Sequence, residues 1–277
     1  MSMHELLKDT RRLFHHIQQM SGEHIVPTVD YPVQASELAE TSAVLFLMGL
    51  SPSPNGSGPE PCLILNKRSE KVKQSGDLCC PGGGVMPGVD AFLARTMTLP
   101  GLPMWRWPFW SRLRNKNPHQ ADTLRFLFFT SIRESFEEMR LNPFGVRFLG
   151  PLPPQKLVMF QKTIYPMMGW ISGQKKFFPN WEVEKIVYIP LKNLLNPKNY
   201  IRYKLYLHAP DTNDSRLMVY DSPSFVHINH MEKEILWGAT CKITLKFLKR
   251  IFDFSPPDIA SLPIVEAMMD ENYANSA

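Results

Sequence analysis

The stretch "SIRESFEEMR", residues 131–140, decides how this chain is interpreted. It carries three glutamates within five residues, directly after an arginine: Arg133, Glu134, Glu137 and Glu138. On a helix, residues three and four positions apart share one face, so these carboxylates lie close together and repel one another. Two interpretations follow. The stretch is either a solvated acidic face or a site for a hard divalent cation, which several carboxylates aimed at one point would bind.

The residues around this stretch predict one amphipathic helix from Asp122 to Leu141. Its apolar positions step by three and four residues, as one buried stripe requires: Leu124, Leu127, Phe128, Ile132, Phe136 and Met139. We expect the helix to begin near Asp122 or Thr123 and to end before Asn142-Pro143, since the residue before a proline disfavours helical geometry. The glutamates then lie beside the buried stripe.

A glycine-rich turn, "PGGG" at residues 81–84, precedes the helix. Glycine has no Cβ, so such a turn lets the backbone approach an ion or a phosphate closely. A turn of this kind is weak support by itself. Followed by a helix that reads Arg-Glu-x-x-Glu-Glu, it favours the cation site over the solvated face.

The rest of the chain predicts a mixed sheet flanked by helices, and therefore an α/β fold. Residues 3–20 have the apolar spacing of a helix, residues 42–50 and 61–69 resemble two strands of a hairpin, and a closing helix is expected at about 234–252. Further strand-like runs are "VRFLGPL", "TIYPMMGWIS", "KIVYIPL", "YKLYLH" and "RLMVYD".

Composition sets the broad class of the protein. The 277 residues are 44% hydrophobic, which allows a substantial core, and the net charge of +5 is mild. That charge suits anionic small molecules, but it forms no basic arm, so no nucleic-acid partner is expected. Four cysteines without a C-x-x-C pair, together with no visible signal peptide, predict a cytoplasmic protein. No apolar run approaches the ~18 residues that a membrane span needs.

The turn and the helix together resemble the Nudix box, whose pattern is Gly-x5-Glu-x7-Arg-Glu-apolar-x-Glu-Glu-x-Gly-apolar. "RESFEEMRL", residues 133–141, matches its second half in register. In the first half, Val89 holds the position of the first glutamate and Asp90 follows it. About thirty extra residues separate the halves, while Ser135 and Arg140 replace an apolar residue and the last glycine. An arginine at a helix C-terminus suits the helix dipole.

Outside the box, three further segments of the chain are similar to the coenzyme A pyrophosphatase branch of the Nudix superfamily. The similar segments are "LILNKRSEKVKQSGDLCCPGG", "PNWEVEKIVYIPLKNLLNP" and "FVHINHMEKEILWGAT". The resemblance implies a Nudix-like α/β/α sandwich with a mixed sheet, to which this chain adds an N-terminal helix and an inserted segment. We expect an N-terminal extension at 1–30, a Nudix domain at 40–255 with the insertion at about 92–121, and a tail at 256–277.

The same resemblance implies a Nudix diphosphate hydrolase that uses Mg2+ or Mn2+ to cleave a nucleotide derivative, with coenzyme A or an acyl-coenzyme A as one candidate. The alternatives are a hydrolase for another nucleoside diphosphate derivative, or a binding or scaffold protein with impaired turnover. The implied metal ligands are Glu134, Glu137, Glu138 and Gly82; the catalytic residues are Glu134, Arg133 and Glu182; the substrate-binding residues are Arg68, Gly83 and Gly84. Glu182, as the base that activates water, competes with an ordinary loop glutamate. Arg133 and Arg68 compete with surface ion pairs and surface arginines.

The inserted segment alternates aromatic and basic residues in "LPGLPMWRWPFWSRLRNK". Three interpretations stay open: a flap that packs on the domain or on a partner subunit, a cover over the active site, and a peripheral membrane contact through residues 100–116. A single-strand nucleic-acid platform ranks below these, because the sequence shows no long basic groove. The sequence leaves the oligomeric state open.

Overall fold

A mixed sheet of eight strands forms the centre of the computed structural model, which describes residues 3–23, 40–52, 58–96, 103–157, 162–208, 217–229 and 232–268. The strands are β1 (Thr41–Leu50), β2 (Pro61–Arg68), β3 (Leu78–Cys79), β4 (Gly82–Gly84), β5 (Val146–Pro151), β6 (Gln155–Leu157), β7 (Lys162–Ile171) and β8 (Val183–Pro190). Their main order is β3-β2-β1-β7-β5, with β4 beside β1, β6 beside β7 and β8 beside β2. β1 runs antiparallel to β2 and parallel to β7, so the predicted hairpin and the mixed sheet are confirmed.

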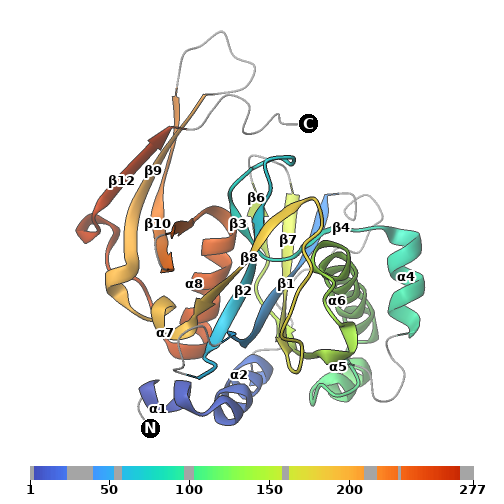
Figure 1. Ribbon diagram of the computed structural model, residues 1–277. Coiled ribbons are helices and arrows are strands. Elements are labelled where there is room, and N and C mark those ends of the chain that lie inside the picture. The colour runs from blue at the N-terminus through green and yellow to red at the C-terminus, as the bar shows by residue number, and fades with distance from the viewer. Residues whose placement is uncertain are drawn as a thin grey trace.

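Helices cover both faces of this sheet (Figure 1). One face packs against α6 (Pro118–Met139), accompanied by α4 (Pro87–Thr96) and α5 (Trp110–Lys116). The other face packs against α8 (Gly238–Phe252) and α2 (Thr10–Glu23), with α1 (Met3–Lys8) beside them. Successive side chains of a strand point to opposite faces of the sheet. Leu45 therefore lies in the cluster with α6, whereas the ring of the next residue, Phe46, packs against Phe247 of α8. The predicted layers of helix, sheet and helix are confirmed.

Helix α6 begins earlier than the sequence predicted. The side chain of Asn117 accepts a hydrogen bond from the Gln120 backbone nitrogen at 3.1 Å, and Pro118 occupies the first turn, where it needs no donor. The prediction of a start near Asp122 was wrong because the first turn is polar and adds nothing to the apolar stripe. Arg140, with φ of 54°, ends the helix in the left-handed region.

The two terminal helices differ from their predictions in similar ways. The helix expected at 3–20 is interrupted at Asp9, between α1 and α2. The helix expected from about Glu234 begins only at Gly238, because β11 (Glu232–Leu236) precedes it. β11 pairs with β10 (Leu217–Asn229), which draws Glu234 into a strand opposite His227.

A second sheet of four strands has the order β11-β10-β9-β12. It contains β9 (Tyr200–His208) and β12 (Ile264–Met268), which pair in parallel, so residues after 255 contribute a strand. The domain boundaries stay a prediction. The described residues also form the short helices α7 (Leu191–Leu194), η1 (Pro143–Gly145), η3 (Pro197–Asn199) and η4 (Ile259–Ser261). Among the described helices, none combines the length and the apolar composition that a membrane span requires.

The described part of the inserted segment packs on the domain. Trp107 and Trp110 are each 2% exposed, and the ring of Trp107 lies 5.0 Å from that of Phe148, centroid to centroid. Trp105, in contrast, is 45% exposed. The first of the three interpretations, a flap packed on the domain, agrees with this burial. Residues 97–102 lie outside the described part, and membrane contact stays a prediction.

Candidate active site

A small open pocket of about 180 Å3 lies where the middle of α6 meets the end of β2, the β3–β4 turn and the loop before β8. These elements come from distant parts of the chain, so the fold assembles the pocket. Its lining combines carboxylates, a guanidinium, an amide and bare backbone: Asn66, Arg68, Val72, Cys79, Gly82, Gly83, Glu134, Glu138, Glu182 and Val183. Five of the predicted site residues besides Arg68 therefore meet at one place: Gly82, Gly83, Glu134, Glu138 and Glu182.

Glu138 is the most buried of the pocket carboxylates, with 8% of its surface exposed. Its Oε2 atom accepts hydrogen bonds from the Gly82 backbone nitrogen at 3.0 Å and from Asn66 Nδ2 at 2.9 Å. Burial raises the pKa of Glu138 to about 8, and repulsion from Glu134 and Glu182 adds to the rise. The sequence did not point to Asn66, because nothing local marks a strand asparagine as a partner of a glutamate 72 positions away.

Glu134 lines the pocket with its carboxyl group directly beside Gly83. A Cβ on Gly83 would lie 2.7 Å from the Glu134 carboxyl group, so only glycine leaves room for this side chain. Burial raises the pKa of Glu134, the charge of Arg133 opposes the rise, and the charge of Glu137 adds to it. Gly82 is required for another reason. Its φ is +144°, and a Cβ there would lie 2.5 Å from the Ala43 carbonyl oxygen.

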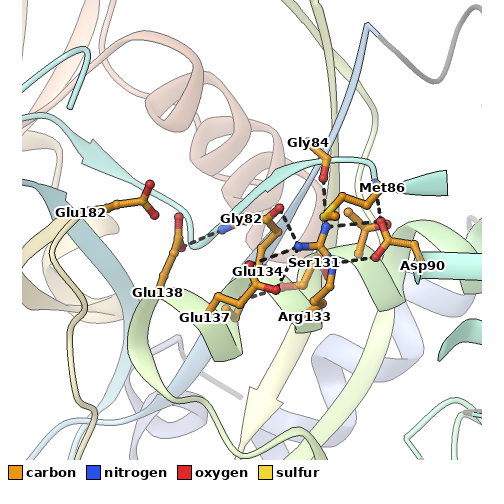
Figure 2. A network of polar contacts seen from close by, with 12 residues as sticks. Gly82, Gly84, Met86, Asp90, Ser131, Arg133, Glu134, Glu137, Glu138 and Glu182 are labelled. Carbon is orange, nitrogen blue, oxygen red and sulfur yellow. Dashed lines mark hydrogen bonds and ion pairs between the residues drawn. The ribbon is translucent and has the colours of Figure 1, made fainter. Parts of the chain in front are cut away.

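Arg133 lies at the centre of a network that ties the glycine turn to α6 (Figure 2). It is 8% exposed, and its Nη2 atom donates to the Gly84 carbonyl oxygen at 3.1 Å. Its Nη1 atom lies 3.0 Å from Glu134 and donates to both oxygens of Glu137 at 3.2 Å. Burial alone would lower the pKa of Arg133, but its carboxylate partners raise it. The guanidinium therefore holds carboxylates through charge-assisted hydrogen bonds.

The strongest partner of Arg133 is Asp90, a residue that the sequence analysis placed only beside the box position. Asp90 is fully buried and accepts from Arg133 Nε at 2.6 Å, the Met86 backbone nitrogen at 2.7 Å and Thr130 Oγ1 at 2.9 Å. Val89, at the counted position, is 44% exposed. α4 begins at Pro87, and Asp90 in its first turn faces α6. The carboxylate missing at position 89 is thus supplied by the next residue.

The remaining predicted residues divide into two groups. Figure 2 shows Glu182 beside Glu138 on one side of Gly82, and both carboxylates line the pocket. Glu182 is held by Asn180, which accepts from its backbone nitrogen at 2.9 Å. Glu137 and Gly84 do not line the pocket and instead contact Arg133. Arg68 lines the pocket, and its Nε donates to the Lys73 carbonyl oxygen at 2.6 Å.

The chemistry of this pocket fits a hard cation. Carboxylate oxygens are the donors that Mg2+ and Mn2+ prefer, and the mutual repulsion of Glu134, Glu138 and Glu182 would be relieved by a positive charge between them. Within the described residues, however, no three His, Cys, Asp or Glu side chains form a ready-made ligand cluster. That arrangement still suits Mg2+, which usually takes one or two carboxylates and keeps several waters.

Two bacterial proteins are similar to most of this chain. The chain is 27% identical over 199 residues to a protein named "Uncharacterized Nudix hydrolase NudL" from Pectobacterium atrosepticum, covering 70% of this chain and 78% of the relative. A protein of the same name from Yersinia enterocolitica is 24% identical over 196 residues, covering 70% and 75%.

Two further comparisons add little to this relationship. The crystal structure of a MutT/nudix family protein from Enterococcus faecalis is similar with a TM-score of 0.40 at 12% identity, covering 94% of this chain and 73% of that one. No family model matches the chain.

Proposed function

We propose that this chain, which is similar to these bacterial proteins, is a Nudix-type hydrolase that cleaves the diphosphate linkage of a nucleotide derivative with the help of Mg2+ or Mn2+. The observation that carries the proposal is the meeting of Glu134, Glu138 and Glu182 with the Gly82–Gly83 backbone and Arg68 in one pocket. Carboxylates suit the cation and the arginine suits a phosphate oxygen.

We assign the parts of the reaction to the residues around this pocket. Glu134 and Glu138 would hold the cation, and Gly82 would offer its carbonyl oxygen. Glu137 contacts Arg133 and does not line the pocket, so its role as a third ligand is the weakest of these assignments. When bound, the cation would neutralise phosphate oxygens and help to orient the attacking water. Arg133 keeps Glu134 in place, and Arg68 would bind a phosphate oxygen of the substrate.

Glu182 is the proposed base that takes a proton from the attacking water. It lines the same pocket as Glu138, and its backbone is fixed twice: its nitrogen donates to Asn180 Oδ1, and its carbonyl oxygen accepts from the Ser69 nitrogen at 2.9 Å. A base must lie within hydrogen-bond reach of the water it activates, and this anchoring would hold the carboxylate at the pocket.

Coenzyme A or an acyl-coenzyme A is the proposed substrate class, on the strength of the segments that resemble the coenzyme A pyrophosphatase branch. A cytoplasmic location belongs to the same proposal and agrees with four free cysteines: Cys62, Cys79, Cys80 and Cys241. The alternative of a binding or scaffold protein rested on Val89 and the divided box. Asp90 supplies a carboxylate partner to Arg133 in place of Val89, which favours the hydrolase over this alternative.

The test is product release from a panel of coenzyme A esters, dinucleoside polyphosphates and nucleotide sugars, with Mg2+, with Mn2+ and with EDTA. We expect metal-dependent cleavage of at least one of these classes into two products, each of which ends in one of the two phosphates of the broken diphosphate linkage. Ligand binding without cleavage of any compound would replace the hydrolase proposal with the scaffold alternative. Cleavage of nucleotide sugars alone would refute the coenzyme A assignment and leave the hydrolase proposal in place.

A further inference from the structure

Asn66 is a polar residue at a fully buried position of β2. It is 1% exposed and follows Leu63, Ile64 and Leu65, each at most 1% exposed. Its main chain is paired on both sides, with Cys79 of β3 and Ile186 of β8. In the described part of the chain its Oδ1 atom has no hydrogen-bond partner. A buried amide that leaves one of its polar atoms unpaired requires an explanation, because an apolar side chain would suit this strand better.

The bonds around Glu138 supply that explanation. Asn66 Nδ2 donates to Glu138 Oε2 at 2.9 Å, and the Gly82 backbone nitrogen donates to the same oxygen at 3.0 Å. Among the described residues, no hydrogen bond goes to the other oxygen, Oε1. Two donors on one oxygen fix the orientation of the carboxyl group, and Oε1 is the oxygen left for the pocket.

We propose that Asn66 is a positioning residue that holds Glu138 with Oε1 available to a divalent cation. This inference rests on the proposed function, because it gives Glu138 the role of a cation ligand. An asparagine suits the task because it donates a hydrogen bond without bringing a charge. A lysine or arginine at this position would place a positive charge beside the cation. Partners that orient a metal ligand typically change metal affinity about 10–100-fold when they are removed.

The test is Mn2+ binding without substrate, measured by isothermal titration calorimetry on the full chain. Asn66→Leu keeps the size of the side chain and removes the donor, so we expect about 10–100-fold weaker Mn2+ binding. Asn199→Leu is the matched control, since Asn199 Nδ2 also donates one bond at 2.9 Å, to the Asn193 carbonyl oxygen outside the pocket. Its Mn2+ affinity should equal that of the wild type. If Asn66→Leu does not unfold cooperatively, Asn66→Ala replaces it.

A double-mutant cycle separates positioning from a general structural role. If Asn66 acts through Glu138, adding Asn66→Leu to Glu138→Ala weakens Mn2+ binding no further than Glu138→Ala alone. Additive losses would overturn the inference, and so would wild-type affinity in both Asn66 variants. Absence of Mn2+ binding by the wild type would overturn it as well. A wild type that binds Mn2+ but cleaves nothing in the substrate panel would refute the proposed function, while the cycle still decides the role of Asn66.

Discussion

The bond between Asp90 and Arg133 gives the sharpest prediction for stability. Asp90 is fully buried, and its four hydrogen bonds come from Arg133 Nε at 2.6 Å, Arg133 Nη2 at 3.3 Å, the Met86 nitrogen at 2.7 Å and Thr130 Oγ1 at 2.9 Å. Removing one partner of a buried ion pair costs about 3–5 kcal/mol, because the other charge stays buried without compensation. We therefore expect Asp90→Ala to lower the unfolding free energy by about that amount.

For a chain of this size, that loss corresponds to a fall of roughly 6–20 °C in the thermal midpoint. Urea unfolding followed by circular dichroism measures the free energy directly. The matched control is Asp122→Ala, which removes the exposed partner of Arg125 on α6, the helix that also carries Arg133. This change should lower the unfolding free energy by less than about 1 kcal/mol. Equal losses for Asp90→Ala and Asp122→Ala would refute the structural role of the buried pair.

A rearranged variant tests the geometry of the same pair. The double substitution Val89→Glu with Asp90→Val restores the spacing of the Nudix box, but it places the carboxylate at a position that is 44% exposed. We expect this variant to be no more stable than Asp90→Val alone. A full recovery of stability would show that α4 can turn to present position 89, contrary to the structure.

Three further predictions concern the glycine turn, the inserted segment and the charge of Glu138. Gly82→Ala should destabilise the fold, because φ is +144° and the new Cβ would lie 2.5 Å from backbone. Gly83→Ala should instead weaken Mn2+ binding in calorimetry, because the new Cβ would displace Glu134. Gly84→Ala is the control for both variants: position 84 has open space around it, so the unfolding free energy and the Mn2+ affinity should stay unchanged. Trp107→Ala should cost about 3–5 kcal/mol in urea unfolding and Trp105→Ala close to nothing, because only Trp107 is buried; similar losses would contradict the packing of the insertion. Burial raises the pKa of Glu138 from 4.5 to about 8, so the metal-free folded state binds more protons than the unfolded state between those values. Stability should therefore fall as pH rises from about 4.5 to about 8, and this fall should be weaker in Glu138→Gln; an identical pH profile for the variant would contradict the raised pKa.

Local sequence patterns were sufficient to predict the strands and the helix that have a clear apolar pattern of their own. β1 and β2 are nearly continuous apolar runs, as strands covered on both faces must be, and the stripe of α6 has helical spacing. One residue of that predicted stripe was wrong, since Phe136 is 44% exposed. Boundaries were missed where the deciding residue lies outside the apolar pattern. Asn117 caps α6 from a polar turn, and Glu234 belongs to β11 because that segment pairs with β10. Lys67 and Lys185 form ion pairs with Glu234 there.

The candidate site divides in the same way. Spacing alone brought Glu134 and Glu138 together on α6, and the composition of the turn identified Gly82 and Gly83. Asp90 and Asn66 depend on contacts 43 and 72 residues apart in sequence, which only the packing of α4 and β2 against α6 reveals. Counting along the box placed Val89 at the position of the first glutamate. The adjacent Asp90 is the buried residue that contacts Arg133, and counting alone could not distinguish the two.

The central claim is that a divalent cation at the Glu134–Glu138 pocket carries diphosphate cleavage. The most direct measurement is the rate of product release from the best substrate of the panel, with Mg2+ and with EDTA, for the wild type and for Glu138→Gln. We predict that EDTA abolishes release by the wild type and that Glu138→Gln is severely impaired at saturating Mg2+. Release at the wild-type rate by Glu138→Gln, or in EDTA, would contradict the claim.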